Sequence, residues 1–433
     1  MNIEHFIAKR IAFSDNKSFT KVIVRIAIAA IAISMTVMIL TTAIISGFKK
    51  EISDKIFGFW GHIHITDSNV NRNFEIVPIP INKPFYDSIR QLKGVAYQEE
   101  PGYIDNLLKR DADVKYTQGG VKGVYPFIIL PGLLNTKEDF QGVLLKGVDK
   151  NYNWEKMNRF IVDGKPIHYV QDSVSDELLI SRNIASKLHL ETGNKVVLNF
   201  IRDESQIKKR FTICGIYNTG LEEYDRRFGI VDLTKLQEIL GWTTDEAQGM
   251  EVVLDNVNDL DVYSDYIYYE MVPQNYYVES IRAKFPGIFE WLKLQDINEK
   301  VIMQLMILVA IINMITVLLI LILERTQMIG ILKSLGMHNG SIRKIFLWNA
   351  GYIIGFGLLI GNLVGLGLAW LQQTFKFIRL DEANYYLDTA PIDIHPETVI
   401  VINIATMLIT ILFLTIPTLI ITRITPVRAL RFE

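Results

Sequence analysis

The chain has 433 residues, of which 49% are hydrophobic and 21% are charged, and its formal net charge at pH 7 is -2. This length allows both a folded domain and several membrane spans. The near-zero net charge, with no stretch that interleaves basic and aromatic residues, argues against nucleic acid as a partner. A single cysteine, Cys214, leaves no basis for a disulfide framework or for a metal site built on cysteines.

Four long apolar runs interrupt otherwise ordinary globular sequence, and each approaches or exceeds the roughly 20 residues that a helix needs to cross a bilayer. They are Val22–Ser46, Val301–Leu323, Ile345–Leu371 and Thr398–Ile421. The first is longer than the apolar core of a secretion signal, about 7–15 residues, and no small-residue cleavage site follows it. The sequence therefore predicts a membrane α-helical protein with four transmembrane helices and a large α+β extracytoplasmic domain between the first and second helices.

Lysine and arginine near the ends of these runs predict the orientation of the chain. They precede the first run, separate the second from the third and follow the fourth, which favours the cytoplasm for these three stretches. The prediction in chain order is a cytoplasmic segment at 1–21, transmembrane helices at 22–47, 298–323, 345–371 and 398–421, an extracytoplasmic domain at 48–297 with an inserted subdomain at roughly 142–240, a cytoplasmic helix at 324–344, an extracytoplasmic loop at 372–397 and a cytoplasmic tail at 422–433. Lys49, Lys50 and Lys55 depart from the rule, although the long domain after them weakens their influence.

The two ends of the extracytoplasmic domain are expected to be helical stalks. Apolar residues four apart continue beyond Phe48, and Pro286 suits the start of a helix that leads into the second span. Just inside the domain, the segment from His62 to Thr66 alternates like a strand with both of its histidines on one face. Two histidines at this spacing can bind a metal, but no third ligand is evident, so we expect a solvated strand face without metal.

Catalytic motifs are missing from the sequence. It contains no phosphate-binding loop of the type G-x-x-x-x-G-K-[ST], no H-E-x-x-H, no G-x-S-x-G and no set of kinase motifs. We therefore expect no catalytic residue and no bound cofactor, and we do not expect this chain to be an enzyme. No acidic residue lies centrally in an apolar run, which argues against a proton- or ion-coupled transporter.

A short amphipathic helix is predicted between the second and third spans. Met328, Ile331, Leu332 and Leu335 recur at helical spacing, and Gly336 follows them where a helix-ending glycine is common. Such a helix can lie on a membrane surface or dock in the groove of a partner. In the third span the run Gly357, Gly361 and Gly365 has the GxxxGxxxG spacing that lets helix backbones approach closely.

Several blocks of sequence resemble the FtsX/MacB-type ABC permeases and, within them, the LolC/LolE transmembrane subunits of the lipoprotein-releasing complex. The resemblance rests on ERTQMIGILKSLGM at 324–337, the glycine-rich third span and the ending TPVRALRFE, with further blocks at 6–10, 46–48, 142–149, 177–193, 215–225 and 291–328. It covers nearly the whole chain. It implies a multi-pass protein of the cell inner membrane whose MacB-like domain lies in the periplasm.

The resemblance also implies a mechanism and a set of partners. In such proteins a separate ABC ATPase binds ATP, and two permease subunits form a homo- or heterodimer. Closure on the cytoplasmic side is relayed to the periplasmic domain by mechanotransmission, and lipoproteins enter sideways from the membrane lipid and pass to a periplasmic lipoprotein chaperone. The segment matched to the family's ATPase-coupling helix contains Glu324, Arg325, Met328, Ile329, Gly330, Ile331, Leu332, Lys333, Leu335 and Gly336.

One feature departs from the chaperone-binding relatives. They carry a longer, proline-containing hook hairpin, whereas this chain has only about Arg202–Arg210 between the matching strands, without proline. Either the basic tip Lys208, Lys209 and Arg210 makes the chaperone contact, or this subunit does not bind the chaperone.

The preferred interpretation is a permease subunit that extracts lipoproteins for sorting to the outer membrane. A MacB-like efflux permease and an FtsX-like permease that regulates cell-wall hydrolases are alternatives within the same family. A membrane-anchored scaffold or sensor is an alternative of another class, and the apolar stripe at 328–335 favours an energised partner over it. The sequence leaves open which lipoproteins are handled and whether the dimer is homo- or heteromeric.

Overall fold

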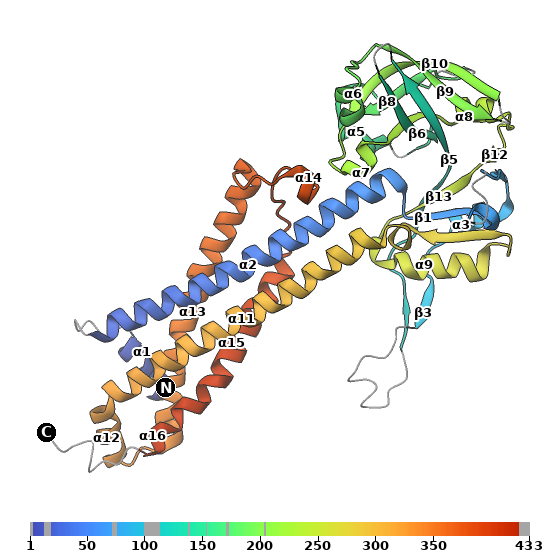
Figure 1. Cartoon of the computed structure of the whole chain (residues 1–433). Coiled ribbons are helices and arrows are strands. Elements are labelled where there is room, and N and C mark those ends of the chain that lie inside the picture. The colour runs from blue at the N-terminus through green and yellow to red at the C-terminus, as the bar shows by residue number, and fades with distance from the viewer. Residues whose placement is uncertain are drawn as a thin grey trace. The chain divides into compact units, whose positions relative to one another are not determined.

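The computed structural model describes residues 3–12, 19–71, 76–98, 113–136, 139–152, 154–169, 173–202 and 205–423 (Figure 1). The chain divides into two compact units. We call Met1–Glu51, Glu290–Leu380 and Thr389–Glu433 the helical unit, and Ile52–Phe289 with Asp381–Asp388 the α+β unit.

Long helices build the helical unit. Its described helices, two of which continue into the α+β unit, are α1 (Ile3–Ala12), α2 (Phe19–Trp60), α11 (Pro286–Glu324), α12 (Thr326–Ser334), α13 (Asn339–Phe375), α15 (Pro396–Thr418) and α16 (Ile420–Arg423). Four stretches, Lys21–Trp60, Pro286–Glu324, Asn339–Phe375 and Pro396–Arg423, are helical and are long and apolar enough to cross a membrane, and each contains one of the four predicted runs. Both stalk predictions are also confirmed, because α2 continues to Trp60 and α11 begins at Pro286.

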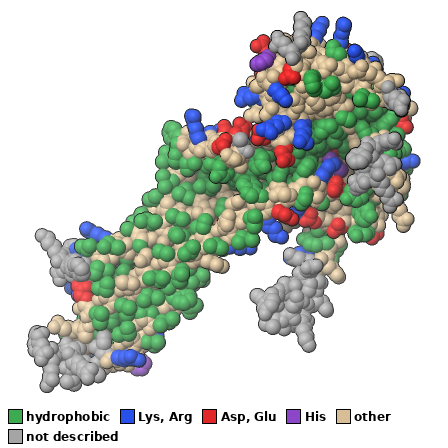
Figure 2. All heavy atoms as spheres, viewed as in Figure 1, with side chains coloured by type: hydrophobic (Ala, Val, Ile, Leu, Met, Phe, Trp, Pro, Cys, Tyr) green, Lys and Arg blue, Asp and Glu red, His purple; other side chains and the backbone are tan. Residues whose placement is uncertain are grey.

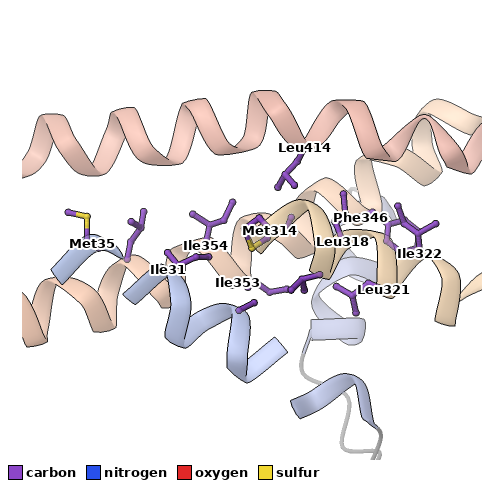
Figure 3. Packing of buried hydrophobic residues seen from close by; sticks show 14 of the residues in the cluster. Ile31, Met35, Met314, Leu318, Leu321, Ile322, Phe346, Ile353, Ile354 and Leu414 are labelled. Carbon is purple, nitrogen blue, oxygen red and sulfur yellow. The ribbon is translucent and has the colours of Figure 1, made fainter. Parts of the chain in front are cut away.

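A shared apolar core holds the membrane-length helices together. Ile31 and Met35 of α2, Leu318 of α11, Ile354 of α13 and Leu414 of α15 are buried and point toward one another (Figure 3). The outer surface of these helices is hydrophobic as well, with charged side chains gathered toward the helix ends (Figure 2). A bundle that is apolar on all sides is typical of helices that lie in lipid.

Acidic partners explain two of the lysines that departed from the orientation rule. Lys49 of α2 lies 2.6 Å from a carboxylate oxygen of Asp296 in α11, and Lys50 lies 3.1 Å from Asp393. Their positive charges are therefore compensated within the helical unit. In the α+β unit the third lysine, Lys55, is buried and donates a hydrogen bond to the carbonyl of Tyr386 at 2.8 Å.

The α+β unit is built around one mixed sheet, part of which is an open antiparallel sheet and part of which is a barrel. Its described strands are β1 (Ile63–Asp67), β2 (Ile79–Pro80), β3 (Ala96–Gln98), β4 (Val114–Tyr116), β5 (Val121–Asn135), β6 (Phe140–Val148), β7 (Ile161–Gly164), β8 (Glu177–Ser181), β9 (Lys195–Arg202), β10 (Ser205–Tyr217), β11 (Phe228–Asp232), β12 (Glu246–Ala247), β13 (Gly249–Leu254) and β14 (Tyr276–Ser280). Its described helices and helical turns are η1 (Ser68–Asn71), α3 (Pro84–Arg90), α5 (Trp154–Asn158), α6 (Arg182–Lys187), α7 (Glu222–Asp225), α8 (Leu233–Leu240), η2 (Val257–Asp259), α9 (Leu260–Tyr266), η3 (Ile267–Met271), α10 (Ile281–Lys284) and α14 (Glu382–Tyr385).

Strand β5 belongs to two layers at once. Its first half, up to Phe127, pairs with β13 in an antiparallel sheet of order β14-β1-β13-β5. From Phe127 onward it pairs with β6, and near its end with β9. Because β6 pairs with β11, β11 with β8, β8 with β10 and β10 with β9, these strands close into a barrel. The barrel interior is apolar and includes Leu130, Leu198 and Phe211.

The prediction for the two histidines is wrong. His62 and His64 have exposed fractions of 0% and 2%, so neither lies on a solvated face. The alternating pattern predicts a strand, and β1 does pair with β13 on one side and β14 on the other. It does not predict that the ring of His62 stacks on Phe57 of α2 or that the ring of His64 lies against Phe127 of β5, because such contacts depend on how separate segments fold together.

Candidate functional site

Helix α12 connects the two central membrane-length helices, α11 and α13. It ends where the sequence predicts, because Gly336 adopts the left-handed backbone with φ of 86° that a helix end commonly needs. The amide of Gly336 donates to the carbonyl of Lys333 and the amide of Met337 to that of Leu332, both at 3.0 Å. These two bonds satisfy carbonyls that the end of a helix leaves without a partner.

The inward side of α12 packs on the core of its own bundle. Ile329 is fully buried in the apolar core, and Gly330 beside it is buried too. Met328 and Leu332 are partly buried against the same core. The predicted stripe is therefore divided, since half of it is used within the chain.

The outward side of α12 carries the other half of the stripe. Ile331 is 49% exposed and Leu335 is 79% exposed, and they lie one helical turn apart. Glu324, the last residue of α11, is exposed, and Arg325 connects the two helices. Two exposed apolar side chains on a short helix form a surface that can dock in an apolar groove.

Polar contacts fix α12 and α13 to the last helices of the chain. Lys333 donates a hydrogen bond of 2.6 Å to the carbonyl of Ile421 in α16, so its head group points away from the exposed side of α12. The Nε atom of Arg343 in α13 lies 3.2 Å from the hydroxyl oxygen of Thr418. These contacts hold α12 in a fixed position against the rest of the bundle.

The three glycines of the third span lie against α2. A Cβ atom on Gly357 would come within 2.7 Å of Ile31, and one on Gly361 within 2.6 Å of the Cβ atom of Met35. A Cβ atom on Gly365 would come within 3.2 Å of Ile39. The hydroxyl of Thr36 also donates to the carbonyl of Gly361 at 3.2 Å. Such close backbone approach requires residues without a side chain at these positions.

Helix α1 is a feature that the sequence interpretation missed. The Nε2 atom of its His5 lies 2.8 Å from the hydroxyl oxygen of Tyr352 in α13. The His5 ring also packs edge to face against the ring of Trp348, with 5.2 Å between the ring centroids. Ala8 is fully buried. Apolar residues at 3, 7 and 11 repeat every four residues, which is the signal that predicts such a helix.

The basic residues of the hairpin do not lie at its tip. Strand β10 is paired with β9 from Ser205 to Thr212, with Lys208 opposite Asn199, Lys209 opposite Leu198 and Arg210 opposite Val197. The last described pair is Ser205 with Arg202, so the turn falls at 203–204, outside the described residues. Lys208 and Arg210 are exposed, whereas Lys209 is half-buried. The predicted basic tip is thus a basic strand face.

Metal-ligating side chains do not gather anywhere in the described part of the chain. Among the described residues, no group of three or more His, Cys, Asp or Glu residues is arranged to hold a metal ion.

Family models match both parts of the chain. The model of the MacB-like periplasmic core domain matches residues 26–267, and that of the FtsX-like permease C-terminal domain matches residues 300–426.

Known proteins are similar to the chain over nearly its full length. The lipoprotein-releasing system transmembrane protein LolC of Xylella fastidiosa is 23% identical over 428 residues, which cover 94% of this chain and 93% of that protein. The corresponding LolE of Haemophilus influenzae is 22% identical over 451 residues and 95% of each chain. A crystal structure of the extracellular domain of the noncanonic ABC-type transporter YknZ from Gram-positive bacteria covers 51% of this chain and 100% of its own, with a TM-score of 0.28 and 15% identity.

Proposed function

Because the chain belongs to the family of FtsX-like permeases with a MacB-like periplasmic core domain, we propose that it is an ABC transporter permease that extracts lipoproteins from the inner membrane for transfer to the outer membrane. A separate ABC ATPase hydrolyses the ATP, so this chain is not itself the enzyme. The observation that carries the proposal is the similarity to LolC and LolE, which includes both the membrane-length helices and the α+β unit.

The proposed mechanism is mechanotransmission. The chain pairs with a second permease subunit, identical or different, and ATP-driven closure on the cytoplasmic side is relayed along α2 and α11 to a periplasmic α+β unit. A lipoprotein leaves the outer leaflet sideways, enters between the two permease subunits and passes to a soluble chaperone. This orientation, with residues 324–344 and both termini in the cytoplasm, follows from the distribution of lysine and arginine.

Within this function, we assign ATPase docking to the exposed side of α12. Ile331 and Leu335 supply the apolar contact with the ATPase. On the other side of the helix, Met328, Ile329 and Leu332 pack on the bundle, so that movement of α12 is passed to the membrane-length helices. Lys208 and Arg210 are the proposed chaperone contacts, because they are exposed on the outer face of the β9–β10 hairpin.

Purification from native membranes tests the function. The detergent-solubilised chain should retain an ABC ATPase and a triacylated lipoprotein. A periplasmic adaptor in place of the lipoprotein would favour MacB-like efflux, and a cell-wall hydrolase would favour FtsX-like regulation. Absence of any ATPase would overturn the proposal in favour of a scaffold or sensor.

Ile331→Asp tests the docking surface. A carboxylate buried without a partner costs several kcal/mol, so ATPase binding should weaken by about a hundredfold or more in a quantitative pull-down. Ile331→Leu, which keeps the apolar contact, and Lys333→Ala, which changes the opposite side of α12, should bind the ATPase nearly as wild type does. Unchanged binding by Ile331→Asp, in a variant with a wild-type melting temperature, would remove α12 as the docking site.

A further inference from the structure

The last turn of α2 lies inside the α+β unit, and side chains from other elements hydrogen-bond to its free carbonyls. The carbonyl of Gly58 accepts from the hydroxyl of Tyr152 at 3.1 Å, and the carbonyl of Phe59 accepts from Lys146. The carbonyl of Trp60 accepts from Nε2 of His64 at 2.7 Å. Helix ends leave their last carbonyls without helical partners, so these contacts satisfy groups that water would otherwise have to reach.

A buried ion pair supports these contacts. The ammonium of Lys146 lies 2.5 Å from a carboxylate oxygen of Glu251, and the two side chains are 0% and 2% exposed. The same ammonium lies over the rings of Phe59 and Tyr152, at 5.1 and 5.2 Å from their centroids. Its positive charge therefore faces the negative end of the α2 dipole, which is stabilising at a helix C-terminus.

His64 extends the network to the start of the second long helix. Burial, with a contribution from the nearby Lys284, lowers the pKa of His64 to about 4, so the ring is neutral at neutral pH. Its Nε2 then donates to α2 and its Nδ1 accepts from Lys284, at 3.2 Å. Lys284 is the last residue of α10, and only Phe285 separates it from Pro286, where α11 begins. We call Lys146, Glu251, His64, Tyr152 and Lys284 the α2 junction.

The α2 junction joins the end of α2 to both the barrel and the antiparallel sheet of the α+β unit. Lys146 lies on β6 of the barrel, whereas Glu251 lies on β13 and His64 on β1 of the antiparallel sheet. Hydrophobic residues of similar volume are often as stabilising as a buried ion pair, so net stability alone does not account for this arrangement. What the polar contacts add is direction, because each one fixes the α2 terminus to a particular strand.

We propose that the α2 junction is the positioning device that transfers movement of α2 to the barrel and the sheet. Without it, the end of α2 would remain apolar and buried but would be free to rotate or fray, and its movement would not be passed on. Lys146 and Glu251 are positioning residues in this scheme, since neither needs to touch a lipoprotein. The expected effect on lipoprotein release rests on the proposed function, whereas the expected effect on the stability of the α2 terminus does not.

The first test replaces the ion pair with apolar side chains. Lys146→Met/Glu251→Leu should keep the fold, because both charges are removed together. Amide exchange at residues 56–61 should accelerate by about tenfold, the factor that corresponds to about 1.4 kcal/mol of lost local stability. The amount of lipoprotein released per ATP hydrolysed should fall by about fivefold or more, while ATP hydrolysis itself continues. A factor of about five is the lower end of the range usual for coupling between two distant sites of a protein.

A disulfide provides the matching rescue. A Cβ atom on Gly58 would lie 3.9 Å from the Cβ atom of Lys156 in α5, a separation that suits a disulfide. In Lys146→Met/Glu251→Leu that also carries Cys214→Ala, oxidised Gly58→Cys/Lys156→Cys should restore release per ATP, and reduction should return it to the lowered value.

The outcomes separate the junction from the function. If wild-type chain with its ATPase releases no lipoprotein, the proposed function fails, and the exchange measurement still decides whether the α2 junction holds the helix end. Wild-type exchange at 56–61 in Lys146→Met/Glu251→Leu, or full release per ATP by this variant, would overturn the inference. A rescue that persists after reduction would overturn it too.

Discussion

The same helix, α2, is held in two different ways in the two units of the protein. In the helical unit it lies against Gly357, Gly361 and Gly365 of α13, and the contact is made by close backbone approach without charged side chains. In the α+β unit its terminus is held by a buried ion pair and by hydrogen bonds to free carbonyls. Where the surroundings are as apolar as the core, close packing of complementary surfaces determines how two helices associate. Where the polar groups would otherwise bind water, charged and hydrogen-bonding side chains determine the position of the helix end.

The largest expected effect comes from breaking the charged contact on one side only. Lys146→Met leaves Glu251 buried without its partner, which should lower the free energy of unfolding by about 3–5 kcal/mol. Chemical denaturation of the full chain in nanodiscs, followed by tryptophan fluorescence, measures this. Lys122→Met, at an exposed position on β5, is the control and should change little. An equal loss of unfolding free energy in both variants would show that the ion pair contributes no more to stability than an exposed lysine does.

Breaking the shape contact should cost somewhat less. Gly361→Leu places a side chain where even a Cβ atom would lie 2.6 Å from Met35 and 2.8 Å from the carbonyl oxygen of Ala32, so the helices must separate. Overpacking of this kind costs about 1–3 kcal/mol and should lower the thermal stability and yield of the complex. Gly367→Leu is the matched control, because nothing lies within 4 Å of its Cβ position. If the control is as damaging, close packing on α2 is not what these glycines provide.

The smallest expected effect is a pH dependence confined to the α+β unit. Burial raises the pKa of Asp225 to about 6, despite hydrogen bonds from Thr219 and Gly220 that lower it. Because the folded form binds the proton more tightly than the unfolded form, this group costs stability above pH 6 and the cost disappears as the pH falls toward 4. Between pH 7 and pH 4, wild type should gain about 2 kcal/mol relative to Asp225→Asn.

Thermal melts of the two proteins across this pH range give the comparison. Parallel curves for wild type and Asp225→Asn would contradict the assignment of the shift to this carboxyl group.

Features that depend on local sequence could be predicted. The four spans, the continuation of α2 to Trp60 and the helix end at Gly336 all follow from runs of apolar residues or from one backbone preference. Each is determined within a few turns of chain, so no knowledge of distant segments is needed.

Features that depend on distant pairing could not be predicted. The barrel closes only because the end of β5 pairs with β9, about 60 residues later, and no pattern in either strand specifies that partner. The buried state of His64 depends on α2 and β13 in the same way. For α12, helical spacing identifies an apolar stripe but does not show that Leu332 packs inward while Leu335 remains exposed, because the bundle itself occupies part of that stripe.

The central claim is that this chain converts the ATP hydrolysis of a partner into lipoprotein extraction. The most direct measurement is release of a fluorescent triacylated lipoprotein from proteoliposomes that contain the chain, its co-purified ATPase and any second permease subunit, with a soluble acceptor outside. The account predicts release that requires ATP hydrolysis and stops with a non-hydrolysable analogue. Hydrolysis at the normal rate with the lipoprotein retained in the membrane would contradict it.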